Sequence, residues 1–105
     1  MDYYFLFAAD KNGEATSPIS WNTPSGKIIV VFQDENETMA VIAAYIASQI
    51  RGVHGINSVC WEFSSIEDVA WKFRQAFLNM ESVSFLLDSD PVVAQLVAGL
   101  RQSGY

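Results

Sequence analysis

Three aspartates stand where expected strands end, and their positions would suit metal chemistry. Asp34 follows the apolar segment 27–33. Asp88 and Asp90 follow the apolar segment 83–87. Ligands of parallel α/β sheets bind beyond the carboxyl ends of the strands, so these side chains could meet there. Because carboxylate oxygens suit hard cations such as Mg²⁺, the pattern would fit a small metal-dependent phosphoryl-transfer or hydrolytic domain.

The same aspartates also fit the role of helix caps, which requires no metal. Asp34 opens the acidic stretch 34–37 before one expected helix, and Asp90 precedes Pro91 at the start of another. An aspartate oxygen satisfies free N–H groups of a first helical turn, and proline is favoured at the first helical position. The enzymatic pattern also lacks a glycine-rich phosphate loop and a neighbouring lysine. We therefore expect caps, with no metal site and no cofactor.

A histidine and a cysteine are the other candidates for catalysis. His54 is the only histidine, between Gly52 and Gly55, and Cys60 is the only cysteine. A histidine can act as a general base, but a Cys–His pair would have to be brought together by the fold. We expect His54 in an exposed turn and Cys60 as a small apolar side chain of a strand. No catalytic residue is predicted.

Segment 14–26 is a candidate recognition loop, in which residues 19–21 could form a short strand. It combines prolines with an aromatic ring and several hydroxyl groups, and binding residues often lie on such loops. The residues predicted to take part are Ser17, Ser20, Trp21 and Thr23. Two interpretations stay open, because Trp21 could read a ligand or could fold back as a lid on the sheet edge.

The elements that must position these residues alternate between strands and helices. Strands are expected at 3–9, 27–33, 57–63 and 83–87, and helices at 37–51, from 65 onwards and from 90 onwards. The continuous apolar run at 27–33 is typical of a strand buried on both faces. In the strand at 57–63, Val59, Trp61 and Phe63 should share one face, and Ser65 should cap the helix that follows. The order β-β-α-β-α-β-α predicts an α/β fold with a small four-stranded mixed sheet, in which the first strand pairs antiparallel with the second. The length of 105 residues favours a single domain, 1–105. The alternative is a ferredoxin-like α+β sandwich, with both main helices on one face.

Charge and composition exclude several classes of partner. Six Lys and Arg residues against twelve Asp and Glu residues give a net charge of −6, and the basic residues are scattered. Nucleic acids and anionic membranes are bound by grouped basic residues, so we expect neither as a partner. A membrane span needs about 20 apolar residues, and the longest apolar run, 39–47, is too short. With no basic residue before the apolar segment 3–9, we also expect no secretion signal, which predicts a cytoplasmic protein.

Two expected helices carry more apolar surface than one small core should need. The helix at 37–51 adds Val41 and Tyr45 beside its main apolar stripe, and Trp71 and Leu78 lie off the stripe of the next helix. A helix that is apolar all round is buried in a larger protein or at an interface. We predict that Tyr45, Trp71 and Leu78 belong to an interface, while a helix enclosed in a three-layer domain is the alternative.

These observations favour a small interaction or regulatory module without enzymatic activity. It would act as a homodimer or as the accessory subunit of a protein partner, since symmetric dimers are the commonest soluble oligomers. The metal-dependent phosphoryl-transfer or hydrolytic domain is the alternative function, and it depends on the convergence of Asp34, Asp88 and Asp90.

Overall fold

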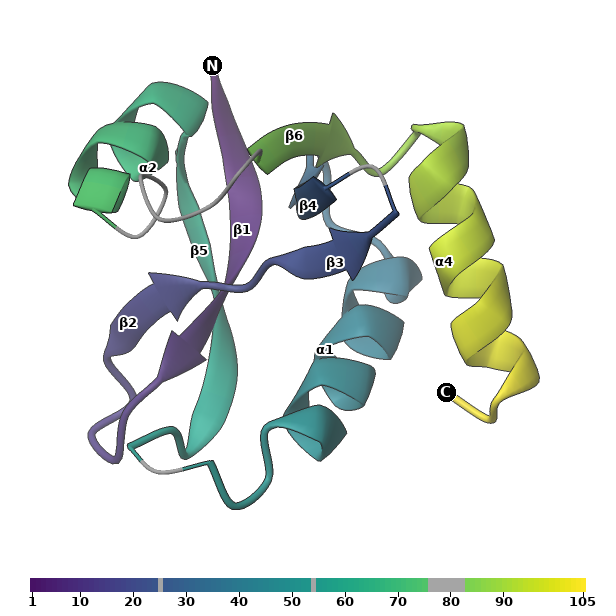
Figure 1. The fold of residues 1–105 in the computed structure, drawn as a ribbon, viewed down its shortest axis with the longest axis horizontal. Helices are drawn as coiled ribbons and strands as arrows, with labels where there is room; N and C mark the ends of the chain where they lie inside the picture. The colour runs from purple at the N-terminus through teal and green to yellow at the C-terminus, as the bar shows by residue number, and fades with distance from the viewer. Residues whose placement is uncertain (25, 54, 76–82) are drawn as a thin grey trace.

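The chain folds into a mixed α/β domain with a curled sheet (Figure 1). The computed structural model describes residues 1–24, 26–53, 55–75 and 83–105. Within these ranges the strands are β1 (Asp2–Ala9), β2 (Ala15–Pro18), β3 (Trp21–Thr23), β4 (Gly26–Phe32), β5 (Ser58–Ser65) and β6 (Val83–Leu87). The helices are α1 (Glu37–Gln49), α2 (Ile66–Lys72) and α4 (Pro91–Gln102).

The sheet has six strands, so the prediction of four is wrong. The two additional strands, β2 and β3, lie in segment 14–26, which was predicted as a loop with a possible short strand at 19–21. These strands are short, mostly polar and partly exposed. They therefore lack the alternation of apolar and polar residues by which a strand is usually predicted. β2 pairs with the end of β1, and the hydroxyl of Thr16 donates to the carbonyl of Ala8 at 3.0 Å. The turn that joins these strands contains Gly13 at φ 78°, a conformation that glycine adopts readily.

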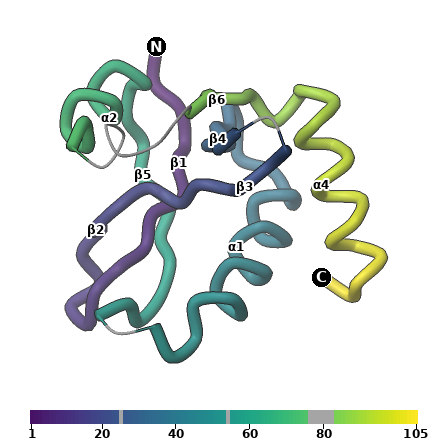
Figure 2. Tube along the Cα trace, in the orientation of Figure 1, coloured from purple at the N-terminus to yellow at the C-terminus, as the bar shows by residue number. Residues whose placement is uncertain are grey.

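β1 and β4 form the centre of the sheet. β1 pairs with β5 along its whole length, and its other edge pairs first with β4 and then with β2. The antiparallel pairing of β1 with β4 confirms the expected pairing of the first strand with the strand at 27–33. β4 also pairs with β3 and, in parallel, with β6. β5 and β6 therefore lie at opposite edges of the sheet, as the course of the chain shows (Figure 2).

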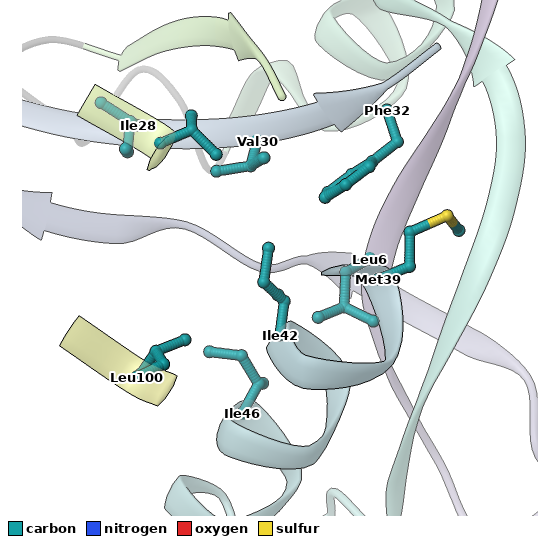
Figure 3. Close-up of a cluster of buried hydrophobic side chains, with 9 residues drawn as sticks. Leu6, Ile28, Val30, Phe32, Met39, Ile42, Ile46 and Leu100 are labelled. Carbon is teal, nitrogen blue, oxygen red and sulfur yellow. The ribbon is translucent and has the colours of Figure 1, made fainter. Parts of the chain in front are cut away.

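Helices cover both faces of the sheet. On one face α1 and α4 pack on Leu6 and on alternate residues of β4, among them Val30 and Phe32 (Figure 3). On the other face α2 contributes Val69, which packs with Ile29 and with its neighbours in β1 and β4. Since α1 and α2 lie on opposite faces, the ferredoxin-like alternative is not the observed arrangement. Burial on both faces explains why β4 is a continuous apolar run.

Side-chain caps set the start of each helix. Asn36 accepts a hydrogen bond from the N–H of Thr38 and caps α1, while the oxygen of Ser65 accepts from the N–H of Asp68 and caps α2. Asp90 accepts from the N–H of Val92 at 2.9 Å and caps α4. The predicted caps at Ser65 and Asp90 are confirmed. At α1 the cap is Asn36 within the predicted stretch 34–37, and Asp34 is not the cap.

Candidate functional site

The three aspartates of the possible metal site have separate structural surroundings. The side chain of Asp90 is engaged at the cap of α4. The amide of Asn36 donates to the carbonyl of Asp34 at 3.2 Å and to a carboxylate oxygen of Asp88 at 3.4 Å. In the part of the chain that the structure describes, no three histidine, cysteine or carboxylate side chains gather closely enough to hold a metal ion. The structure thus does not bring Asp34, Asp88 and Asp90 together as ligands.

The residues of the predicted recognition loop lie at three separate places. Ser20 and Trp21 line a hollow of about 600 Å³ between β3, α1 and α4, and Tyr45 lines it as well. Thr23 closes the turn between β3 and β4, because its hydroxyl donates to the carbonyl of Gly26 at 2.6 Å. Ser17 is exposed on β2, away from this hollow.

Trp21 and Tyr45 cover the core together. Their ring centroids are 5.7 Å apart, and the ring of Tyr105 meets Tyr45 edge-on at 5.3 Å. Both Trp21 and Tyr45 are half-buried and pack against the cluster under α1. The second apolar side of α1 therefore meets other parts of the same domain. This is the lid arrangement that the sequence left open for Trp21.

The other predicted interface residues lie elsewhere. Trp71 is 69% exposed on α2, on the opposite face of the sheet from Tyr45. The guanidinium of Arg74 lies 4.1 Å from the centroid of the Trp71 ring and also donates to the Trp71 carbonyl. Leu78 and His54 lie outside the described residues. Tyr45 and Trp71 therefore cannot belong to one continuous patch.

The outer edge of β5 is the surface that the sequence did not reveal. β5 pairs with β1 through eight consecutive residues without a bulge, and no described strand pairs with its other edge. Such an edge presents free N–H and C=O groups, which natural proteins usually protect with lysine, proline, a bulge or a covering segment. The segment 58–65 contains no lysine and no proline. Among the described strands, the outer edge of β5 is left without a partner.

An aromatic groove lies beside this edge, on the α1 side of the sheet. Trp61 meets the buried ring of Phe32 edge-on at 5.4 Å, and Phe63 lies 4.8 Å from the ring of Tyr4. Tyr4, Trp61 and Phe63 line a groove of about 440 Å³ together with the first turn of α1. Phe63 remains 58% exposed. We call the edge of β5 and this groove the β5 surface.

Two ionisable groups on or beside β5, Tyr4 and Cys60, have raised pKa values, which favours their neutral forms. Burial raises the pKa of Tyr4, and the Glu35 carboxylate, which accepts a hydrogen bond from it, raises this pKa further. On the other side of β5, burial and the Glu62 carboxylate raise the pKa of the Cys60 thiol, whose sulfur lies 3.8 Å from Glu62 Oε1. Neither group is poised as an anionic nucleophile, and the Tyr4 hydroxyl serves as a donor within the groove.

The sequence predicted which side chains of β5 share a side of the strand, but it did not predict the position of β5 at the edge of the sheet. The expected common side for Val59, Trp61 and Phe63 is the observed one, since these residues alternate with Cys60 and Glu62 in register with β1. Strand order depends on contacts between distant segments, so the exposure of Phe63 had no local signal. Cys60 is half-buried because its strand is at an edge.

No family model matches the chain, and no curated protein or solved structure matches it significantly. None of the helices in the described ranges is long and apolar enough to cross a membrane.

Proposed function

We propose that this chain is a non-enzymatic interaction module that acts as a homodimer through its β5 surface. The observation that carries the proposal is a regular strand whose outer edge no described strand pairs with, and an exposed aromatic ring beside it. Strand addition at a sheet edge supplies main-chain hydrogen bonds, and neighbouring pockets that accept alternate side chains supply specificity. The β5 surface combines both features.

The apolar character of the β5 surface supports association over exposure to water. Among the described residues, Phe63 is the one phenylalanine that is exposed, with 58% of its surface accessible. Apolar area in contact with water costs about 25 cal/mol per Å². A second strand along β5 would cover this ring and pair the free backbone groups in one step. Aromatic residues are also enriched at the centres of protein interfaces.

The metal-dependent alternative has weaker support. The side-chain amide of Asn36 donates to the backbone carbonyl of Asp34 and to the carboxylate of Asp88, and the carboxylate of Asp90 caps α4. The raised pKa of the Cys60 thiol also disfavours a thiolate mechanism. The chemistry of the described residues therefore favours binding over catalysis.

Light scattering of the purified protein over a concentration series tests the proposal. The wild type should approach a mass twice 11.7 kDa. Phe63→Glu should weaken the dimer by about 30-fold or more, because residues central to an interface contribute about 2 kcal/mol or more. Trp71→Glu is the matched control, since it places the same charge on an exposed aromatic position of α2 and should leave the mass unchanged.

Two results would overturn the proposal. One is a wild type that stays monomeric throughout the series. The other is a dimer that dissociates with Trp71→Glu and persists with Phe63→Glu, which would move the interface to α2. Circular dichroism of both variants establishes that the fold is retained.

A further inference from the structure

We infer that two copies of this chain pair their β5 strands antiparallel about a two-fold axis at Trp61, so that one sheet runs through the dimer. The inference rests on the proposed function and deepens it, because it specifies the partner strand and its register. The occupant is a second copy because the β5 sequence complements itself in this register.

Symmetry restricts the possible registers. A two-fold axis that relates antiparallel neighbours stands perpendicular to the sheet, so the α1 sides of both copies lie on the same side. Side chains that face each other across the new pair must then come from the same side of the sheet. The axis must therefore lie midway between one residue of β5 and the same residue of the second copy, rather than at the level between two successive residues.

Strand length leaves two registers that use most of β5. An axis at Trp61 pairs residues 58–64 with the same residues of the second copy, which is seven of the eight residues of the strand. An axis at Glu62 pairs residues 59–65, also seven of the eight. An axis at Cys60 or at Phe63 pairs only five residues of the strand, 58–62 or 61–65, and leaves more backbone groups without a partner.

Charge separates the two remaining registers. An axis at Glu62 sets this carboxylate directly opposite its copy, and like charges that face each other across a strand pair are destabilising. An axis at Trp61 sets Glu62 opposite Cys60 of the second copy. The Cys60 thiol is neutral, because its pKa is raised, and it already lies near Glu62 within its own strand. The register at Trp61 therefore avoids the repulsion.

The apolar side of the strand fits the same register. With the axis at Trp61, Phe63 of each copy faces Val59 of the other, and the two Trp61 rings meet at the axis. Val59 and Trp61 are half-buried on the α1 side of the sheet, next to the aromatic groove. An aromatic ring opposite a β-branched residue is a stabilising cross-strand pair. This contact would cover the exposed ring of Phe63.

Disulfide trapping measures the register. In the register at Trp61, Ser58 faces Ser64 of the second copy, at a separation that a disulfide can span. Ser58→Cys and Ser64→Cys, combined in a Cys60→Ser background, should give a cross-linked dimer under mild oxidation. Each single cysteine variant in that background should stay unlinked, because each position is then far from its own copy.

The native cysteine supplies a second test that needs no variant. In the register at Trp61, the two Cys60 residues lie diagonally, about 7–8 Å apart, which is too far for a disulfide without movement of the backbone. The oxidised wild type should therefore remain free of the Cys60 cross-link. A Cys60 disulfide in the wild type would overturn the register.

A third variant detects the competing register. Ser64→Cys with the native Cys60 would cross-link only if the axis lay at Glu62, so its cross-linking would also overturn the inference. A protein that is dimeric by light scattering but is not trapped by the Ser58→Cys and Ser64→Cys pair would overturn the register and leave the proposed function standing. A monomeric protein would overturn both.

Discussion

Asp90 is the residue whose role is defined most sharply by its contacts. Its carboxylate accepts a hydrogen bond from the N–H of Val92 at 2.9 Å, and Pro91 occupies the first helical position. Asp90→Ala should lower the free energy of unfolding by about 1 kcal/mol, because an N–H group of the first turn loses its acceptor. Asp90→Ser should restore most of this loss. Chemical denaturation of the three proteins measures both effects, and equal losses in the two variants would contradict the role as a cap.

The electrostatic effect of Glu62 on Cys60 can be tested by substitution. Burial and the nearby carboxylate keep the pKa of Cys60 above its ordinary value, so less thiolate is present at a given pH. Glu62→Gln should lower this pKa and increase the rate of alkylation by iodoacetamide at mildly alkaline pH, since only the thiolate reacts. Burial should keep part of the shift in the variant.

Glu67→Gln is the control for this measurement. It removes the same charge from the exposed first turn of α2, and it should leave the rate profile of Cys60 unchanged. Alkylation rates followed against pH for the wild type and both variants make the comparison. Identical profiles for Glu62→Gln and the wild type would show that the carboxylate does not act on the thiol.

Among the elements, β4 holds the two layers of the core together. Its residues alternate between the cluster under α1 and the cluster under α2, and Ile29 is only 1% exposed on the α2 side. Ile29→Ala should lower the free energy of unfolding by about 2–5 kcal/mol, through lost apolar contact and the cavity left behind. Val92→Ala is the comparison, because Val92 is 43% exposed on α4 and should change stability by about 0.5 kcal/mol or less.

Urea denaturation of both variants checks this prediction. A loss at Ile29 as small as that at Val92 would contradict the central place of β4 in the core.

Local sequence signals predicted the elements well, because those signals are themselves local. The doubly buried run of β4, the caps Ser65 and Asp90, and the common side of Val59 and Trp61 all follow from neighbours in the chain. β2 and β3 form hairpins with β1 and β4, their neighbours in the chain. These short strands lack the regular alternation of apolar and polar residues that signals a strand, so β2 was not predicted and only residues 19–21 were expected as a possible strand.

The candidate site depended on information that no local pattern carries. Tyr45 and Trp71 were both predicted for an interface from surplus apolar residues, but the fold buries half of Tyr45 under Trp21 and leaves Trp71 exposed on the other face. Which strand lies at the edge is decided by the order of the whole sheet. Phe63 is a candidate interface residue because β5 pairs with β1 alone among the described strands, and this pairing is not visible in the local sequence.

The net charge of the chain should oppose the association that we propose for the β5 surface. Each chain carries a net charge of −6, so two copies repel each other over the distance that salt leaves unscreened. The screening length falls from about 30 Å at 0.01 M salt to about 8 Å at 0.15 M. Added salt should therefore tighten the dimer, as sedimentation velocity at a fixed protein concentration would show. Dissociation on adding salt would instead indicate an interface held by ion pairs.

Amide hydrogen exchange tests whether a second copy covers the outer edge of β5. Backbone N–H groups that point away from β1 should exchange slowly at a protein concentration where the dimer is populated, because they are then paired. They should exchange faster on dilution, or in Phe63→Glu, while the protection of β4 stays unchanged. Exchange from residues 58–65 that is fast and independent of concentration in a dimeric protein would contradict the claim.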